Sequence, residues 1–255
     1  MCRFKSGIIL KNKVVLTPIF NDSHSTLLES MGIKDDRIGM TKIFVRAELI
    51  PPNNNVFASI NKWKFIVDQD VVPEWFENDR GKYEEEMRTA VADFVKNNFA
   101  EILGYAWSPI DLGNGCTRYV LFGSLNRSEF GKTNNYKEST VRQDLNNSEL
   151  CKRLKEMHGD RLVPITLSLT TMDGLHDYGT VEGDYLSLLN LDIYRECGEY
   201  IPCLDIPWWL ATGESTDRRY GSDYVRYVRS NGNVGCCDCG WDDKGVRPFF
   251  IARER

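Results

Sequence analysis

The sequence lacks long apolar runs, an excess of positive charge and a recognisable export signal. No apolar run approaches the roughly 18 residues of a membrane-spanning helix, so no membrane partner is expected. The formal net charge is −5 at pH 7, and a phosphate-binding surface needs basic side chains, so nucleic acid is a disfavoured partner. The first five residues are not followed by an apolar stretch of signal-peptide length before the polar residues 11–13, which favours a cytoplasmic location.

The composition that remains is that of an ordinary globular protein. The chain has 255 residues, of which 42% are hydrophobic and 27% charged, enough for one large domain or two small ones. Between residues 82 and 103, apolar side chains recur every three or four positions, which predicts a helix. The composition then changes to a stretch rich in Gly and Asn at 111–115. We therefore predict a boundary within about ten residues of Gly104, dividing the chain into domains 1–103 and 104–255.

The first hundred residues have the patterns of a small α+β domain. Apolar runs at 4–10 and 14–19 are separated by a polar connection of hairpin length. Helix-capping residues that begin at Asn21 precede a short predicted helix that ends at Gly32. Residues 42–50 and 63–67 alternate apolar and polar side chains, which is typical of strands.

The sequence pattern of the second half predicts two short helices and two strands, so the whole chain is expected to be α+β. The strands are expected at 118–123 and 163–169. The expected helix caps are Ser139 or Thr140 for the first helix and Asn147 or Ser148 for the second. The side chains expected to be buried are Val141 and Leu145 in the first helix, and Leu150, Leu154 and Met157 in the second.

Eight cysteines lie at positions 2, 116, 151, 197, 203, 236, 237 and 239. Without an export signal, free buried thiols are favoured over disulfides. Cys236, Cys237 and Cys239 are a weak alternative as a metal site, because no second ligand pair lies at the usual spacing. On a strand, Cys237 and Cys239 would share one face and Cys236 would lie on the other with Asp238, which favours packing over chelation. No cofactor is expected.

Four spaced blocks of the second half occur in a recognisable order. They are Ser-Thr-Val-Arg followed by Leu-Asn at 139–146, an aspartate before an apolar run at 184–189, Trp-Trp-Leu at 208–210 and Gly-Val-Arg-Pro at 245–248. Together they resemble the C-type-lectin-like domains related to formylglycine-generating enzyme, in particular a bacterial and phage branch. The resemblance covers about residues 104–255 and implies a twisted antiparallel core, two helices and long loops on one side. At least one of Trp208 and Trp209 is then expected in the core, and Arg247 is expected to satisfy buried carbonyls or a carboxylate such as Asp205.

The motifs that give activity to the better-known relatives are not reproduced. The flanks of the cysteine cluster differ from the copper-binding catalytic context of formylglycine-generating enzymes, and only His24, His158 and His176 are present. The Glu-Pro-Asn and Trp-Asn-Asp motifs of calcium-dependent sugar-binding lectins are missing.

The expected function is therefore non-enzymatic binding, with a protein partner favoured and a small molecule or glycan as alternatives. The acidic net charge and the resemblance also suggest a phage-encoded inhibitor of a bacterial defence protein. Loops carry the variable side chains of such scaffolds, and Tyr, Trp and Arg dominate binding hot spots. The candidate binding residues are Arg218, Arg219, Tyr220, Tyr224, Tyr227 and Trp241.

Cys2 supports a different class of function. If the initiator methionine is removed, Cys2 becomes an N-terminal nucleophile whose own α-amine can act as its base, as in some hydrolases and amidotransferases. The glycine that usually follows such a cysteine is replaced by Arg3, and no companion motif stands out downstream. An enzyme that uses Cys2 is therefore the alternative to a binding protein.

Overall fold

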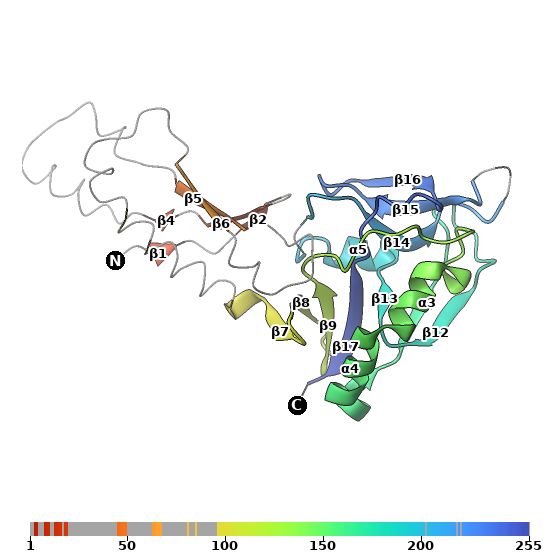
Figure 1. Cartoon of the computed structure of the whole chain (residues 1–255), viewed down its shortest axis with the longest axis horizontal. Coiled ribbons are helices and arrows are strands. Elements are labelled where there is room, and N and C mark those ends of the chain that lie inside the picture. The colour runs from red at the N-terminus through yellow and green to blue at the C-terminus, as the bar shows by residue number, and fades with distance from the viewer. Residues whose placement is uncertain are drawn as a thin grey trace, which may run out of the picture.

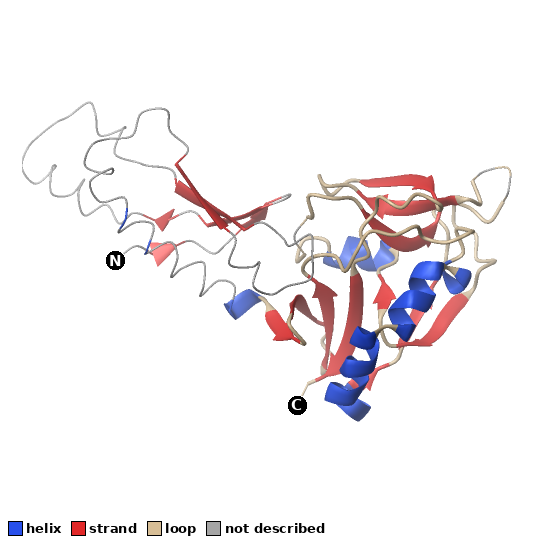
Figure 2. Ribbon diagram, viewed as in Figure 1, coloured by secondary structure: helices blue, strands red, loops and turns tan. Residues whose placement is uncertain are grey.

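The chain has the mixed helices and sheets of an α+β protein, as the sequence predicts, and all the strand pairs among the described residues are antiparallel (Figures 1 and 2). The computed structural model describes residues 96–201, 203–217, 219 and 221–254, together with Gly81, Glu85 and six short strands before residue 68. Among these residues, no helix is both long and apolar enough to cross a membrane.

The strands before residue 68 form two small sheets. Strands β1 (Arg3–Phe4) and β4 (Pro18–Ile19) pair with each other. A four-stranded sheet has the order β2 (Ile8–Leu10), β3 (Lys13–Leu16), β5 (Val45–Leu49) and β6 (Trp63–Val67). The pairing of Leu10 with Lys13 confirms the predicted hairpin. The predicted helix before Gly32 lies outside the described residues, and so does Cys2.

The prediction of a helix up to residue 103 is wrong at its C-terminal end. Residues 96–98 are helical, but β7 (Ala100–Ile102) is a strand that pairs with β8 (Tyr105–Asp111). Leu103 and Gly104 form the two-residue turn between them, both with positive φ (56° and 80°), as a tight hairpin requires. The glycine that marks the predicted boundary is thus part of a hairpin, and the sheet of the second half begins before it.

A six-stranded antiparallel sheet is built around the C-terminal strand β17 (Pro248–Arg253). On one side, β17 pairs with β9 (Cys116–Leu121), which continues to β8 and β7. On its other side lie β13 (Ser187–Leu188) and β10 (Leu162–Val163). The strand expected at 163–169 is divided: Pro164 separates β10 from β11 (Ile165–Ser168), which pairs in another sheet with β12 (Thr180–Asp184). Proline lacks the N–H that a continuous ladder needs.

Three short α-helices accompany the sheets in residues 104–254 of the described structure, and two of them confirm the predicted caps. They are α3 (Thr140–Asn147), α4 (Glu149–His158) and α5 (Leu191–Cys197), with 3-10 turns η3 (Tyr136–Glu138) and η4 (Gly159–Arg161). Ser139 caps α3 and Ser148 caps α4. Met157 was expected to be buried but is 48% exposed. In the last turn of α4, His158 points toward the core instead, and its ring lies 5.4 Å from the ring of Phe250.

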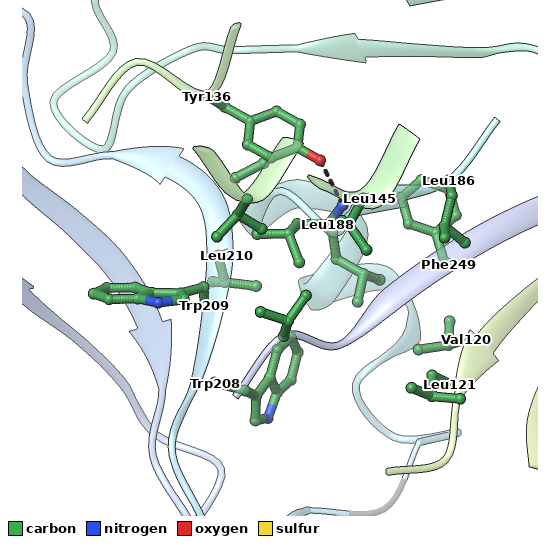
Figure 3. Close-up of a cluster of buried hydrophobic side chains, with 14 of the residues drawn as sticks. Val120, Leu121, Tyr136, Leu145, Leu186, Leu188, Trp208, Trp209, Leu210 and Phe249 are labelled. Carbon is green, nitrogen blue, oxygen red and sulfur yellow. Dashed lines mark hydrogen bonds between the residues drawn. The ribbon is translucent and has the colours of Figure 1, made fainter. Parts of the chain in front are cut away.

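A three-stranded sheet, formed by β14 (Trp208–Gly213), β15 (Tyr224–Val228) and β16 (Val234–Asp238), joins the core through its two tryptophans. Trp208 and Trp209 are both buried (Figure 3). The Tyr136 hydroxyl accepts a hydrogen bond from the Leu188 N–H at 3.0 Å in the same cluster (Figure 3). Arg247 is fully buried and donates to the carbonyls of Leu121 and Phe122, which confirms its predicted structural role.

Candidate binding surface

Only some of the predicted binding residues come together. Tyr224 begins β15 and is 46% exposed, and Trp241 follows β16 and is 56% exposed. Tyr224 is opposite Asp238, the last residue of β16, in the β15–β16 ladder, so the backbone that leads to Trp241 leaves the three-stranded sheet at the end where Tyr224 lies. Arg219 is exposed and pairs with Asp217 at 2.8 Å. Arg218 and Tyr220 lie outside the described residues.

Tyr227 does not belong to this exposed group. Its neighbour across the ladder is Trp209, whose ring lies 6.4 Å away at nearly a right angle. Gly235 faces it from β16, where a Cβ atom would lie 2.9 Å from the tyrosine ring. Tyr227 is therefore half-buried and packs against Trp209, and its role as a ligand-contacting residue stays a prediction.

A second loop adds apolar side chains to the same end of the sheet. Met172 and Leu175 are exposed, and the Met172 N–H donates to the carbonyl of Gly213, the last residue of β14, at 3.0 Å. With Tyr224 and Trp241 they make up four of the six large hydrophobic side chains that are exposed in the described part of the chain. We call the described residues of 171–178, 214–224 and 238–243 the loop surface; it lies at the right-hand end of the three-stranded sheet in Figure 1.

Sequence reasoning missed Met172 and Leu175, although a signal was present. Asp173-Gly174 is a typical turn dipeptide, and Gly174 has a φ of 87°. Apolar residues on both sides of such a turn have no partner within the turn itself. Their exposure could therefore have been proposed, but their proximity to Gly213 depends on a contact between segments some forty residues apart.

Asn134 fixes the base of the loop between β14 and β15. Its side chain is fully buried and its Nδ2 donates to the carbonyls of Ser215 (2.8 Å), Tyr224 (3.1 Å) and Gly221 (3.3 Å). Its Oδ1 accepts from the Tyr178 hydroxyl at 2.5 Å. One amide thus joins both ends of the 214–224 loop to the 171–178 loop. The exposed side chains are therefore presented from a rigid base, which lowers the entropy cost of binding.

Trp241 is held from beneath by a buried lysine. Lys244 is 3% exposed, and its Nζ lies 4.9 Å from the Trp241 ring, 5.0 Å from Tyr227 and 5.7 Å from Trp209. The ammonium also forms an ion pair with Asp243. Cation–π attraction and the ion pair together compensate for the lost hydration of the charge. This contact occupies the inner side of Trp241 and leaves much of the indole exposed.

The cysteine cluster has the arrangement predicted for packing. Cys237 and Cys239 are buried, whereas Cys236 and Asp238 are exposed. Burial raises the pKa of the Cys237 thiol to about 11 and also raises that of Cys239, so both thiols stay protonated near neutral pH. In the described part of the chain, no group of three or more His, Cys, Asp or Glu side chains is placed to hold a metal ion.

The described residues also offer little to a hydrolytic mechanism. His176 Nδ1 lies 2.9 Å from Thr170 Oγ1, a hydroxyl–imidazole pair that a nucleophilic mechanism could use. No described carboxylate bonds the other ring nitrogen, so nothing there orients the imidazole as a base.

Comparison with protein-family models, with curated proteins and with solved structures gives no match to this chain. The candidate site therefore rests on its geometry.

Proposed function

We propose that this protein is a non-enzymatic binding protein that contacts another protein through the loop surface. The observation that carries the proposal is the presence of four exposed large hydrophobic side chains, Met172, Leu175, Tyr224 and Trp241, in segments that meet or leave the three-stranded sheet at one end. Grouped exposed apolar side chains mark interaction sites, and Trp and Tyr dominate the energetics of such sites. The Asn134 amide and the Lys244 ammonium beneath them hold the surface in one conformation.

The proposal includes a C-type-lectin-like scaffold for the second half of the chain, which begins with β7 at Ala100, and a separate α+β domain before it. Contacts between the blocks that carry the resemblance support the scaffold. Arg142 and Asp184 form a two-bond ion pair at 2.7 and 2.9 Å. Asn146 donates to the carbonyl of Leu186, in the apolar run of the second block. Between the last two blocks, the backbone N–H of Trp209 donates to the Gly245 carbonyl at 3.0 Å. Inhibition of a bacterial defence protein by a phage-encoded member is one form that this binding would take.

Affinity capture from a bacterial lysate tests the proposal. The test variant is Tyr224→Ala/Trp241→Ala, and the matched control is Met157→Ala/Tyr200→Ala, which removes the two exposed large hydrophobic residues away from the loop surface. We expect a stoichiometric partner with the wild type and the control, and its loss with the test variant. Equal capture by both variants would show that the loop surface is not the binding site.

A further inference from the structure

Strand β16 is the outermost strand of the three-stranded sheet (Figure 1). It pairs with β15 along its whole length, from Val234 to Asp238, without a shift in register. In the described part of the chain, β15 is its only strand partner. The opposite edge of β16 is therefore without a paired strand among these residues.

The hydrogen bonds at both ends of the β15–β16 ladder show which backbone groups of β16 turn outward. The opposite pairs Arg229–Asn233 and Asp223–Cys239 are bonded, each through an N–H to carbonyl bond of 2.8 Å. Bonded and non-bonded pairs alternate in an antiparallel ladder, so every second residue of β16 bonds to β15. The residues that instead turn their N–H and C=O groups away from β15 are Val234, Cys236 and Asp238.

Most of these outward groups have no partner in the described ranges. The Asp238 carbonyl accepts a bond from the Trp241 N–H at 3.3 Å, whereas the outward groups of Val234 and Cys236 bond to no described residue. Cys236 is exposed and Val234 is half-buried, so the middle of this edge is accessible to solvent. Water satisfies such groups in a single chain, and a further strand satisfies them in a larger sheet.

The features that normally protect an edge strand are missing from β16. Proteins prevent edge pairing with very short strands, bulges, prolines or lysines. Other edges in residues 96–254 have such features: β7 and β10 have three and two residues, and the β11–β12 and β14–β15 ladders contain register shifts. Strand β16 has five residues, no bulge, no proline and no lysine, and its one charged residue, Asp238, is its last. Its edge is therefore able to pair with another chain.

The outward residues of β16 match those of a second copy. They are evenly spaced about Cys236, so a two-fold axis there would pair Cys236 with Cys236 of the second copy and Val234 with Asp238 of the second copy. No like charges then face each other, whereas an axis at Asp238 would place two carboxylates opposite one another. The same axis sets Gly235 opposite Cys237 of the second copy, and a glycine within a strand lets another backbone approach closely.

The space beside Gly235 disfavours a foreign strand with large side chains. Domains that capture a foreign strand read its alternate side chains in pockets beside the edge. A Cβ atom on Gly235 would lie 2.9 Å from the Tyr227 ring and 3.0 Å from Arg229 Nε, so these side chains already fill that space. A strand that brings only small side chains to this position fits, and β16 itself is such a strand.

We propose that the open edge of β16 pairs with β16 of a second copy of this chain, about a two-fold axis at Cys236. The dimer then has one continuous antiparallel sheet with three strands from each copy. This inference goes beyond the proposed function, because it concerns another edge of the sheet and another partner. The two copies of β16 run in opposite directions, so the loop surfaces that follow their C-terminal ends lie at opposite ends of the shared sheet. Both loop surfaces stay available to other partners.

Sedimentation equilibrium of the full chain at roughly 1–100 μM tests the dimer. We expect the average mass to rise with concentration from that of one chain toward that of two. Cys236→Lys is the test variant, because it places two ammonium groups opposite each other at the axis. Cys236→Ser is the matched control, because serine is similar in size and keeps the outward N–H. We expect self-association to be about tenfold weaker in the lysine variant and within about threefold of the wild type in the serine variant.

Cys236→Pro distinguishes pairing between chains from folding of the sheet. Proline lacks an N–H, but at position 236 this group points away from β15, so the ladder within the chain loses no bond. The near-ultraviolet circular dichroism of this variant should match that of the wild type, while its mass stays that of one chain.

Cross-linking with bismaleimidoethane tests the position of the axis. Each thiol adds to one maleimide of this short reagent, so no oxidant is needed. Peptide mass spectrometry of the dimer should find Cys236 linked to Cys236 of the second copy, and this link should be absent from Cys236→Ser.

A wild-type chain that stays monomeric at about 100 μM would overturn the inference. Equal self-association of the lysine and serine variants, or a dimer without the link at Cys236, would overturn it too. If the chain is monomeric and Cys236→Pro loses its partner in the lysate capture, the edge of β16 receives a foreign strand instead. Tyr224→Ala/Trp241→Ala should dimerise as the wild type does, so this inference and the proposed function fail independently.

Discussion

Replacing Asn134 with alanine tests whether one buried amide holds the loop surface in place. The substitution removes three donated hydrogen bonds, to the carbonyls of Ser215, Gly221 and Tyr224, and the acceptor for the Tyr178 hydroxyl. The site is fully buried, so water does not readily replace the lost contacts.

The expected cost follows from the geometry. The bonds to Ser215 and Tyr224 are short, at 2.8 and 3.1 Å, and the one from Tyr178 is 2.5 Å, whereas the bond to Gly221 is longer, at 3.3 Å. A net value of about 1 kcal/mol for each of the three shorter bonds predicts a loss of about 3 kcal/mol in the free energy of unfolding. Since domains of this size are stable by roughly 5–15 kcal/mol, the variant should still fold.

Urea unfolding followed by tryptophan fluorescence measures the loss, and amide hydrogen exchange locates it. Exchange should accelerate in residues 171–178 and 214–224 and remain unchanged in β17, because the amide bonds only the loops. Asn126→Ala is the control, since this asparagine is exposed and its side chain forms no hydrogen bond with the described residues. A loss below about 1 kcal/mol, with unchanged exchange in both loops, would refute the reasoning.

Three further predictions concern the scaffold and its thiols. Asp184→Asn, which breaks the two-bond ion pair with Arg142, should cost about 2–3 kcal/mol in urea unfolding. Burial lowers the pKa of His158, so as the pH falls this histidine is protonated in the unfolded chain before it is protonated in the folded one. The free energy of unfolding should therefore decrease as the pH drops below about 6.5, and it should decrease less in His158→Phe. In brief iodoacetamide labelling read by peptide mass spectrometry, exposed Cys236 should react well before Cys237, whose pKa is about 11; equal labelling would contradict the burial argument.

Local signals in the sequence predicted local structure well. Ser139 and Ser148 cap their helices because a hydroxyl two or three residues before an apolar stripe satisfies a free N–H of the first turn. The alternation around Cys237 correctly separated buried from exposed side chains, since neighbouring residues of a strand point to opposite faces. These predictions need only the residues that they concern.

Predictions failed where a distant segment decides the outcome. The periodicity of the helix before residue 99 continues into residues that become β7, because pairing with β8 outweighs helix propensity there. Met157 has the spacing of a buried residue, but α4 turns His158 toward Phe250 instead. Neither partner can be identified from the segment itself.

The candidate surface shows the same division. Trp209, Tyr227 and Trp241 are the residue types that dominate binding sites, yet only Trp241 is largely exposed. The difference arises from position: Trp209 and Tyr227 pair across a ladder and their rings pack against each other, whereas Trp241 lies beyond the last residue of β16. A strand fixes the direction of each side chain, and the turn after it does not. Residue type therefore selects the candidates for binding, and the end of the strand decides which of them a partner can reach.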